Sequence, residues 1–326
     1  MRRTLLLLIS AVLLAPAAAH AAGGPVVGLD GSSGVVTPDG AYRIVTFASG
    51  DHTVVARVHV HDGTIARYRT IPGRYAVPAV AYDSSASGLS ADGRTLVLIR
   101  PRYQISQTRT HLLVLTADRL LHTRSIVLRG DFSFDAISPD GSKMFLVQYA
   151  ALSRHGFDPT DYAVRQLDIR SGKLAAAAVV DPREPGEKMG GIPVTRAVSP
   201  DGRWAYTLYS ADKPFVHALD TVRGTARCID LDSLAKRHDL FQLKLLVPPD
   251  GRRIQVMDGA RPVLQVDAAS FAVSKPHTPP AAVATDSPPA THGGHAPTWP
   301  FALAALLVVL IAAASARPLA RATRGR

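Results

Sequence analysis

The chain has 326 residues, of which 47% are hydrophobic, 19% charged and 6% aromatic, and it contains one cysteine, Cys228. This composition excludes a disulfide scaffold, a disordered polyelectrolyte and a multispan membrane protein. The formal net charge of +11 falls to about +5 between residues 22 and 298, where basic runs with interleaved aromatic residues do not occur, so nucleic-acid binding is not expected.

The N-terminus has the three parts of a secretory signal peptide. Arg2 and Arg3 precede the apolar run 5–14, and a stretch of small residues follows it. We expect cleavage after Ala21, with cleavage after Ala19 as the alternative. Residues 1–21 are therefore predicted to be a signal peptide.

Asp-Gly turns recur through the region 22–274, at intervals of 53, 48, 61 and 49 residues. The five turns are Thr37-Pro38-Asp39-Gly40, Ser90-Ala91-Asp92-Gly93, Ser138-Pro139-Asp140-Gly141, Ser199-Pro200-Asp201-Gly202 and Pro248-Pro249-Asp250-Gly251. Repeats of about 40 to 50 residues made of short strands are typical of propeller blades, whereas a helical solenoid has an apolar period of about 3.6 residues.

The residues around the turns have the pattern of β-strands. Proline, aspartate and glycine suit successive positions of a tight turn, so each turn predicts a hairpin. The predicted strands are 41–47, 94–99, 143–149, 204–209 and 253–257 after the turns, 132–137 and 194–198 before two of them, and 54–61, 111–116, 162–169, 215–220 and 227–231 further along. We predict an all-β propeller of five blades, or of six if the terminal strands form another blade.

The Ser-Pro-Asp-Gly motif, followed by an alternating strand and by a strand that ends in Asp and a small-residue turn, resembles the WD40-like repeats of bacterial TolB-type and YVTN-type β-propellers. The resemblance extends over about 240 residues and implies a propeller fold. Such propellers include binding platforms, translocation partners and some enzymes, so it implies no single function. The segment 181–230 resembles uncharacterised secreted actinobacterial propellers, which implies no known activity.

The candidate binding residues lie near the longest of the four intervals. We interpret 181–195 as an inserted loop, because long loops on a rigid scaffold commonly carry recognition. Arg196 follows on a predicted inner strand, where it either points into the central channel or forms a surface salt bridge. His217 is either a buried structural imidazole or a ligand or base. The candidate binding residues are Arg183, Glu184, Glu187, Lys188, Met189, Arg196 and His217.

The sequence lacks the motifs of hydrolase nucleophile elbows, phosphate loops, dinucleotide sites and zinc proteases. Its Asp-Gly turns also lack the residue that separates Asp from Gly in a sialidase Asp-box. Cys228 lies in an alternating strand and is interpreted as a half-buried structural thiol; as a nucleophile it would need a neighbouring base. We therefore predict no catalytic residue, no cofactor and no metal ligand.

The C-terminal part predicts a membrane anchor. Residues 275–298, rich in Pro, Ala, Thr and His, favour a semi-rigid stalk. The apolar segment 299–316 reaches roughly 27 Å as a helix, enough to span the hydrocarbon layer. The tail 317–326 contains four arginines and no acid, which places it in the cytoplasm. We expect a single-pass protein of the cell membrane whose residues 22–298 are extracytoplasmic.

The sequence leaves three hypotheses for the function. The first is a binding or interaction module for a protein, a peptide or an envelope ligand. The second is a cofactor-free, lactonase-like hydrolase, in which Arg, His and acidic side chains from Asp181, Glu184, Arg196 and His217 would converge at the channel mouth. The third is metal handling by the stalk histidines His277, His292 and His295, which by themselves form a weak site.

Overall fold

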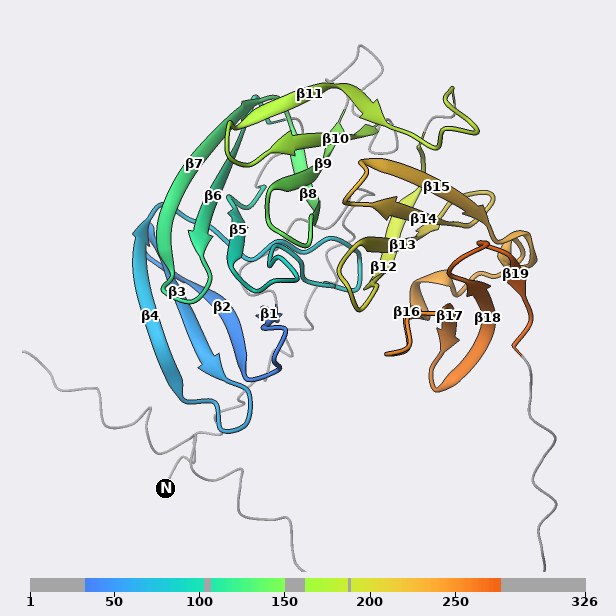
Figure 1. Cartoon of the computed structure of the whole chain (residues 1–326), viewed down its shortest axis with the longest axis horizontal. Helices are drawn as coiled ribbons and strands as arrows, with labels where there is room; N and C mark the ends of the chain where they lie inside the picture. Colours follow the sequence, from blue (N-terminus) through green and yellow to red (C-terminus); the bar gives the residue numbers. More distant parts are fainter. Residues whose placement is uncertain (1–32, 103–106, 150–161, 187–188, 277–326) are drawn as a thin grey trace, which may run out of the picture. The chain divides into compact units, whose positions relative to one another are not determined.

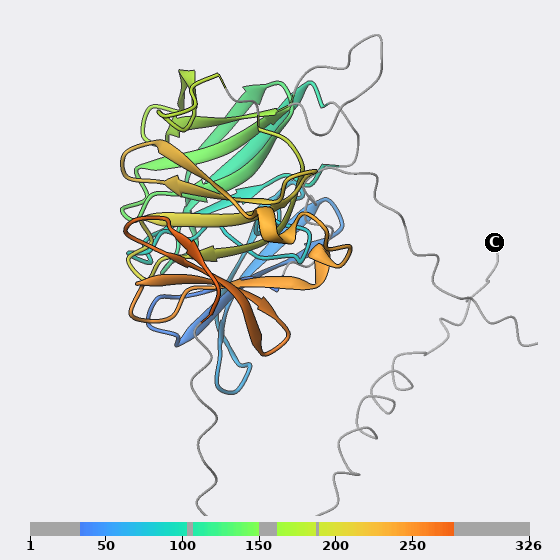
Figure 2. The same cartoon turned by 90° about the vertical axis from the view of Figure 1, so that its right-hand side faces the viewer.

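Five antiparallel β-sheets follow one another along the chain and lie side by side around a common centre (Figures 1 and 2). The structure is a computed structural model that describes residues 33–102, 107–149, 162–186 and 189–276. This arrangement confirms the predicted all-β propeller, with five blades in the described residues. The predicted signal peptide 1–21, the segment 299–316 and the tail 317–326 lie outside these ranges, and within them no helix has the length and apolar character of a membrane span.

The blades are built from consecutive strands, with the first strand of a four-stranded blade nearest the centre (Figure 1). Blade one consists of β1 (Val35–Val36), β2 (Tyr42–Ser49), β3 (His52–His59) and β4 (Ile65–Pro72). Blade two consists of β5 (Thr95–Ile99), β6 (Arg109–Thr116) and β7 (Leu121–Arg129). Blade three consists of β8 (Phe132–Ile137), β9 (Lys143–Tyr149), β10 (Tyr162–Asp168) and β11 (Lys173–Val179). Blade four consists of β12 (Ile192–Val198), β13 (Trp204–Ser210), β14 (Phe215–Asp220) and β15 (Thr225–Asp230). Blade five consists of β16 (Leu243–Leu246), β17 (Arg253–Asp258), β18 (Arg261–Asp267) and β19 (Val273–Ser274), and it follows two 3-10 turns, η1 (Asp232–Leu234) and η2 (Leu240–Gln242).

The Asp-Gly turns are stabilised by a short network of hydrogen bonds. In blade three the Ser138 hydroxyl donates to Asp140 Oδ1 at 2.6 Å, and the same oxygen accepts the backbone N–H of Ser142 at 3.0 Å. The bond from Ser138 is the main reason why the pKa of Asp140 lies below its ordinary value. Gly141 has a φ of +68°, the left-handed conformation that glycine adopts without steric cost. The turns are therefore hairpins, as their sequence predicts.

The turns of different blades also pack on one another near the centre. A Cβ added to Gly93 would lie 3.1 Å from Pro38 of the preceding turn, and one added to Gly202 would lie 2.3 Å from the Cβ of Ala91. The N–H of Asp92 donates to the carbonyl of Pro139 at 3.0 Å. The repeated turns thus hold the inner ends of the blades together.

Apolar side chains fill the spaces between neighbouring blades. Leu96 and Leu98 of blade two pack with Ile44 of blade one, and Ile254 of blade five packs with Val216 of blade four. All five side chains are fully buried, and each such burial stabilises the fold by roughly 1.5–3 kcal/mol. Strand β8, whose six residues are all buried, contributes side chains to two of the apolar clusters.

Blade two lacks a regular inner strand in the described residues, and the segment 76–89, here called the strap, takes its place. The strap pairs with β5 through Ala76 and Leu89. Its tip then reaches across to blade four, where the N–H groups of Tyr82 and Asp83 donate to the carbonyls of Pro193 and Val194 at 2.8 and 3.1 Å. The strap therefore connects blade two directly with the inner strand β12.

Candidate functional site

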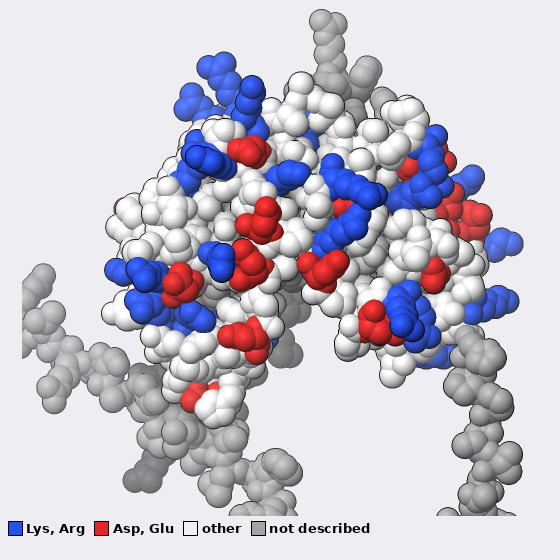
Figure 3. Space-filling model, viewed as in Figure 1, with Lys and Arg blue, Asp and Glu red and all other residues white. Residues whose placement is uncertain are grey.

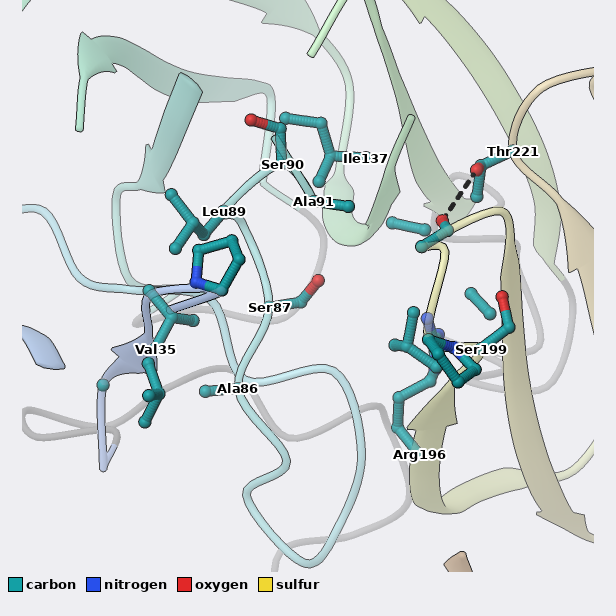
Figure 4. A pocket seen from close by; sticks show the side chains of 18 of the residues that line it. Val35, Ala86, Ser87, Leu89, Ser90, Ala91, Ile137, Arg196, Ser199 and Thr221 are labelled. Carbon is teal, nitrogen blue, oxygen red and sulfur yellow. Dashed lines mark hydrogen bonds between the residues drawn. The ribbon is translucent and has the colours of Figure 1, made fainter. Parts of the chain in front are cut away.

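A pocket of about 430 Å³, here called the channel-mouth pocket, lies among the inner ends of the blades (Figure 4). It is bounded by β1, the strap, the end of β8, β12 and the turn that follows β12. Val35, Ser87 and Leu89 lie on one side, and Arg196 and Ser199 face them across the pocket. Its hydroxyl groups come from Ser33, Ser87, Ser90, Ser199 and Thr221, and its larger apolar side chains from Val35, Val36, Pro38, Leu89, Ile137, Val198 and Pro200.

Arg196 is the only charged residue that lines this pocket within the described chain, and its charge is compensated. Its Nη2 group donates to the carboxylate of Asp135, and Nη1 donates to the backbone carbonyl of Asp135 at 3.1 Å. Both side chains are only 4% exposed. A buried cation held by its own carboxylate has little attraction left for a second anion, so the pocket is in effect neutral.

A row of side chains crosses blade four from the channel to its outer edge. In the registers of the sheet Arg196 pairs with Thr207, Thr207 with His217, and His217 with Cys228. Directly paired residues of antiparallel strands project from the same face of the sheet, so these four side chains form one line. The Thr207 hydroxyl and His217 Nε2 are buried without a hydrogen-bond partner in the described part of the chain.

His217 is a neutral imidazole at physiological pH. Its residue is 1% exposed, and burial lowers its pKa to about 4. The positive charge of Arg196 lowers this pKa further, while Asp135 and Asp181 act in the opposite direction. Two strands separate His217 from the inner edge of its blade, so the imidazole does not reach the channel-mouth pocket.

A second, smaller cavity of about 40 Å³, here called the outer cavity, lies where the end of β11 meets β14 and β15. It is lined by Val179, Val180, Asp181, Glu184, Met189, Phe215, His217 and Cys228. Three of the predicted binding residues, Glu184, Met189 and His217, therefore meet around one space. Because this cavity is separate from the channel-mouth pocket, the predicted residues do not form one site.

Asp181 fixes the chain beside the outer cavity. Its carboxylate accepts hydrogen bonds from the backbone N–H of Arg183 at 2.9 Å and from that of Cys228 at 3.1 Å. The Arg183 guanidinium also donates to it, at 2.6 Å. Burial raises the pKa of Asp181, but these bonds outweigh burial and keep the pKa below its ordinary value. Asp181 is thus a structural anchor for the loop.

The structure corrects the extent of the predicted loop. Since β12 begins at Ile192, the connection between β11 and β12 covers 180–191, and Thr195 belongs to a strand. Arg183 is half exposed at the edge of the loop. Arg196 forms no surface salt bridge, because its ion pair with Asp135 is buried. Glu187 and Lys188 lie outside the described residues.

Two buried arginines have acidic partners that were not predicted from the sequence. Asp135 pairs with Arg196, and Asp131 pairs with Arg102, whose guanidinium lies 4.2 Å from the ring centre of Tyr149. Both acids are in or next to the apolar stretch 132–137. An acid in a strand that is otherwise buried is the signal that predicts a buried cation opposite to it.

On the face seen in Figure 3, acidic and basic side chains are interspersed and do not gather into one large patch of a single sign. In the described residues no group of three or more His, Cys, Asp and Glu side chains is placed to hold a metal ion. The two cavities described above therefore differ in lining: the central pocket is in effect neutral, and the small outer cavity has both polar and apolar side chains.

The chain matches no known protein-family profile and no curated protein sequence. Similar solved structures include a putative TolB from Agrobacterium tumefaciens, with 15% identity and a TM-score of 0.39 over 73% of this chain and 70% of that one. TolB from Acinetobacter baumannii has 13% identity and a TM-score of 0.39 over 72% of this chain and 52% of that one. The Swd1 β-propeller domain from Myceliophteria thermophila has 11% identity and a TM-score of 0.42 over 77% and 72%. The chain is a β-propeller by its own sheet topology, and TolB-type propellers are among the structures to which it is similar, as its Asp-Gly repeats predicted.

Proposed function

We propose that this protein is a binding module whose channel-mouth pocket takes an uncharged peptide segment of a protein partner. The observation that carries the proposal is the lining of the pocket: its hydroxyl groups lie among apolar side chains, and its one cation is already paired with Asp135. Backbone amides and short side chains of a peptide find hydrogen-bond partners and apolar contacts in such a pocket, whereas a phosphate or carboxylate finds no available positive charge.

The hydrolase alternative has less support from the geometry. A lactonase-like mechanism needs an acid, an arginine and a histidine that face one substrate. Arg196 and Asp135 bond to each other, and His217 is buried two strands away from the inner edge of the blade. Of these three residues only Arg196 lines the channel-mouth pocket, so a substrate there would contact only Arg196 directly.

The proposal includes the placement of the module outside the cell. It rests on the signal-peptide pattern in residues 1–21, the apolar segment 299–316 and the arginine tail. A reporter joined after Arg326 should be active in the cytoplasm, and one inserted after Pro276 should be active outside it. External protease should digest the region 30–270 in intact cells, and protection of this region would refute the placement.

Binding is tested by selecting peptides from a random displayed library on the full-length protein in detergent. We expect the enriched peptides to lack charged side chains. Their dissociation constants should increase at least about tenfold for Val36→Trp and Ser87→Trp, which fill the pocket. Ala177→Trp on the exposed strand β11 is the matched control and should bind as the wild type does. Enrichment of charged peptides, or equal binding to all four proteins, would contradict the proposal.

A further inference from the structure

The outer cavity brings three side chains with soft donor atoms to one small space. His217 and Cys228 are direct partners on β14 and β15, so their Cβ atoms are about 4.5–5.5 Å apart on one face of the sheet. Met189 comes from the connection before β12, packs against the apolar clusters on either side and lines the same cavity. The volume of about 40 Å³ suits one ion or water-sized molecule, not an organic ligand.

His217 supplies an independent indication of a ligand. Its Nε2 atom is buried without a hydrogen-bond partner in the described chain, although the residue is 99% buried and lines the cavity. A buried polar atom in this condition is unfavourable unless a water or an ion satisfies it. Imidazole nitrogen is a common metal ligand.

Arg183 and Asp181 hold the backbone of Cys228 beside the cavity. The Arg183 guanidinium donates to the backbone carbonyl of Cys228 at 3.1 Å. Of the two carboxyl groups at the cavity, that of Asp181 already accepts bonds from Arg183 and from the Cys228 N–H. A hard, oxygen-preferring cation therefore finds few available ligands here.

We propose that the outer cavity binds one copper(I) ion through the Cys228 thiolate, His217 Nε2 and the Met189 thioether. Thiolate and thioether sulfur select copper(I), which forms stable complexes with two or three ligands. Structural zinc sites take four, and the described residues hold no such cluster of His, Cys, Asp and Glu. On binding, the sulfur–copper bond forms as the thiol proton leaves for solvent, and no electron is transferred.

The test is an anaerobic titration of the full-length protein with copper(I), in competition with a chromogenic copper(I) chelator. The titration uses a background in which the stalk histidines 277, 292 and 295 are replaced by serine, so that only sites elsewhere in the chain are measured. We expect one ion per chain and a thiolate-to-copper absorption band in the near ultraviolet. The affinity should fall at least about 100-fold for Cys228→Ser and His217→Gln, and about tenfold for Met189→Leu.

Met257→Leu is the matched control for Met189→Leu, because Met257 is partly buried on β17 of blade five, away from the cavity. It should leave the affinity unchanged. His217→Gln risks destabilising the core, so X-ray absorption of the copper-loaded protein provides a readout that needs no variant, with two sulfur atoms and one nitrogen expected around copper. Failure to compete with the chelator, unchanged affinity in Cys228→Ser, or a copper environment without sulfur would overturn the proposal.

Discussion

The Arg196 guanidinium donates to both the carboxylate and the backbone carbonyl of Asp135, and so joins the inner strand of blade four to the inner strand of blade three. The two groups are buried beside the channel-mouth pocket. This one contact neutralises the pocket and fixes the spacing of two of its walls. The Arg196–Asp135 pair therefore affects both the stability of the propeller and the charge of the channel-mouth pocket.

Removing one charge of this pair should be strongly destabilising. In Asp135→Asn the guanidinium of Arg196 stays buried without a counter-charge, so we expect the free energy of unfolding to fall by about 3–5 kcal/mol in urea titrations. The double variant Asp135→Asn with Arg196→Met removes the uncompensated charge and should recover part of this loss. A double variant less stable than Asp135→Asn alone would contradict the proposed role of the buried charge.

Substitutions at Gly40 and Gly202 should distinguish the effect of backbone strain on stability from the effect of steric crowding. Gly40 and Gly202 have nearly the same φ, +69° and +72°. A Cβ on Gly40 meets nothing within 4 Å, whereas one on Gly202 would lie 2.3 Å from Ala91. We expect Gly40→Ala to cost about 1 kcal/mol from strain alone and Gly202→Ala to cost roughly 1–3 kcal/mol more, measured by chemical denaturation. Equal losses would show that the turns do not pack on each other.

His217 should make the stability depend on pH. Its pKa is about 4 in the folded protein, against 6.5 when exposed. Below pH 6.5 the unfolded chain binds a proton that the folded protein does not, so acid lowers the free energy of unfolding. Between pH 7.5 and pH 5 the contribution is about 2 kcal/mol. His217→Gln should remove this part of the decline, and the same change at the exposed His122 should not. An equal decline in His217→Gln and in the wild type would argue against the shifted pKa.

The ion pair at the tip of the strap should matter little. Lys244 Nζ lies 2.8 Å from Asp83 Oδ2, but the lysine side chain is about half exposed to solvent. We expect Lys244→Met to change the free energy of unfolding by less than about 1 kcal/mol, because solvent around the lysine screens the pair and the Asp83 carboxylate, although only 9% exposed, keeps its hydrogen bonds from the backbone N–H and hydroxyl of Ser85. The strap is held mainly by the backbone bonds of Tyr82 and Asp83 to β12. A larger loss in thermal or urea unfolding would show that the salt bridge holds the strap.

The repeated turns made the architecture predictable. Strands 143–149 and 215–220 were predicted with the bounds that β9 and β14 have. The first follows an Asp-Gly turn, and the second ends in Asp220 before a short turn. The outer strand β4 was not predicted. Seven of its eight residues are exposed, so its sequence has no alternation of buried and exposed positions.

The candidate site was less predictable, because it depends on contacts between distant residues. Asp135 and Arg196 are 61 residues apart, and the sequence of neither strand specifies the other as its partner. The turn pattern alone predicts a regular inner strand in blade two. The strap takes the place of that strand. His217 and Cys228 were each considered separately, and only the register of β14 with β15 places them side by side.

The peptides selected on the protein allow the most direct test of the channel-mouth pocket. A selected peptide that carries a diazirine group is bound to the full-length protein, irradiated and digested, and the modified residues are identified by mass spectrometry. We predict adducts on residues that line the pocket, such as Val36, Ser87 and Val198. Adducts confined to outer strands such as β11, with the pocket residues unmodified, would contradict the central claim that this propeller binds its ligand at the channel mouth.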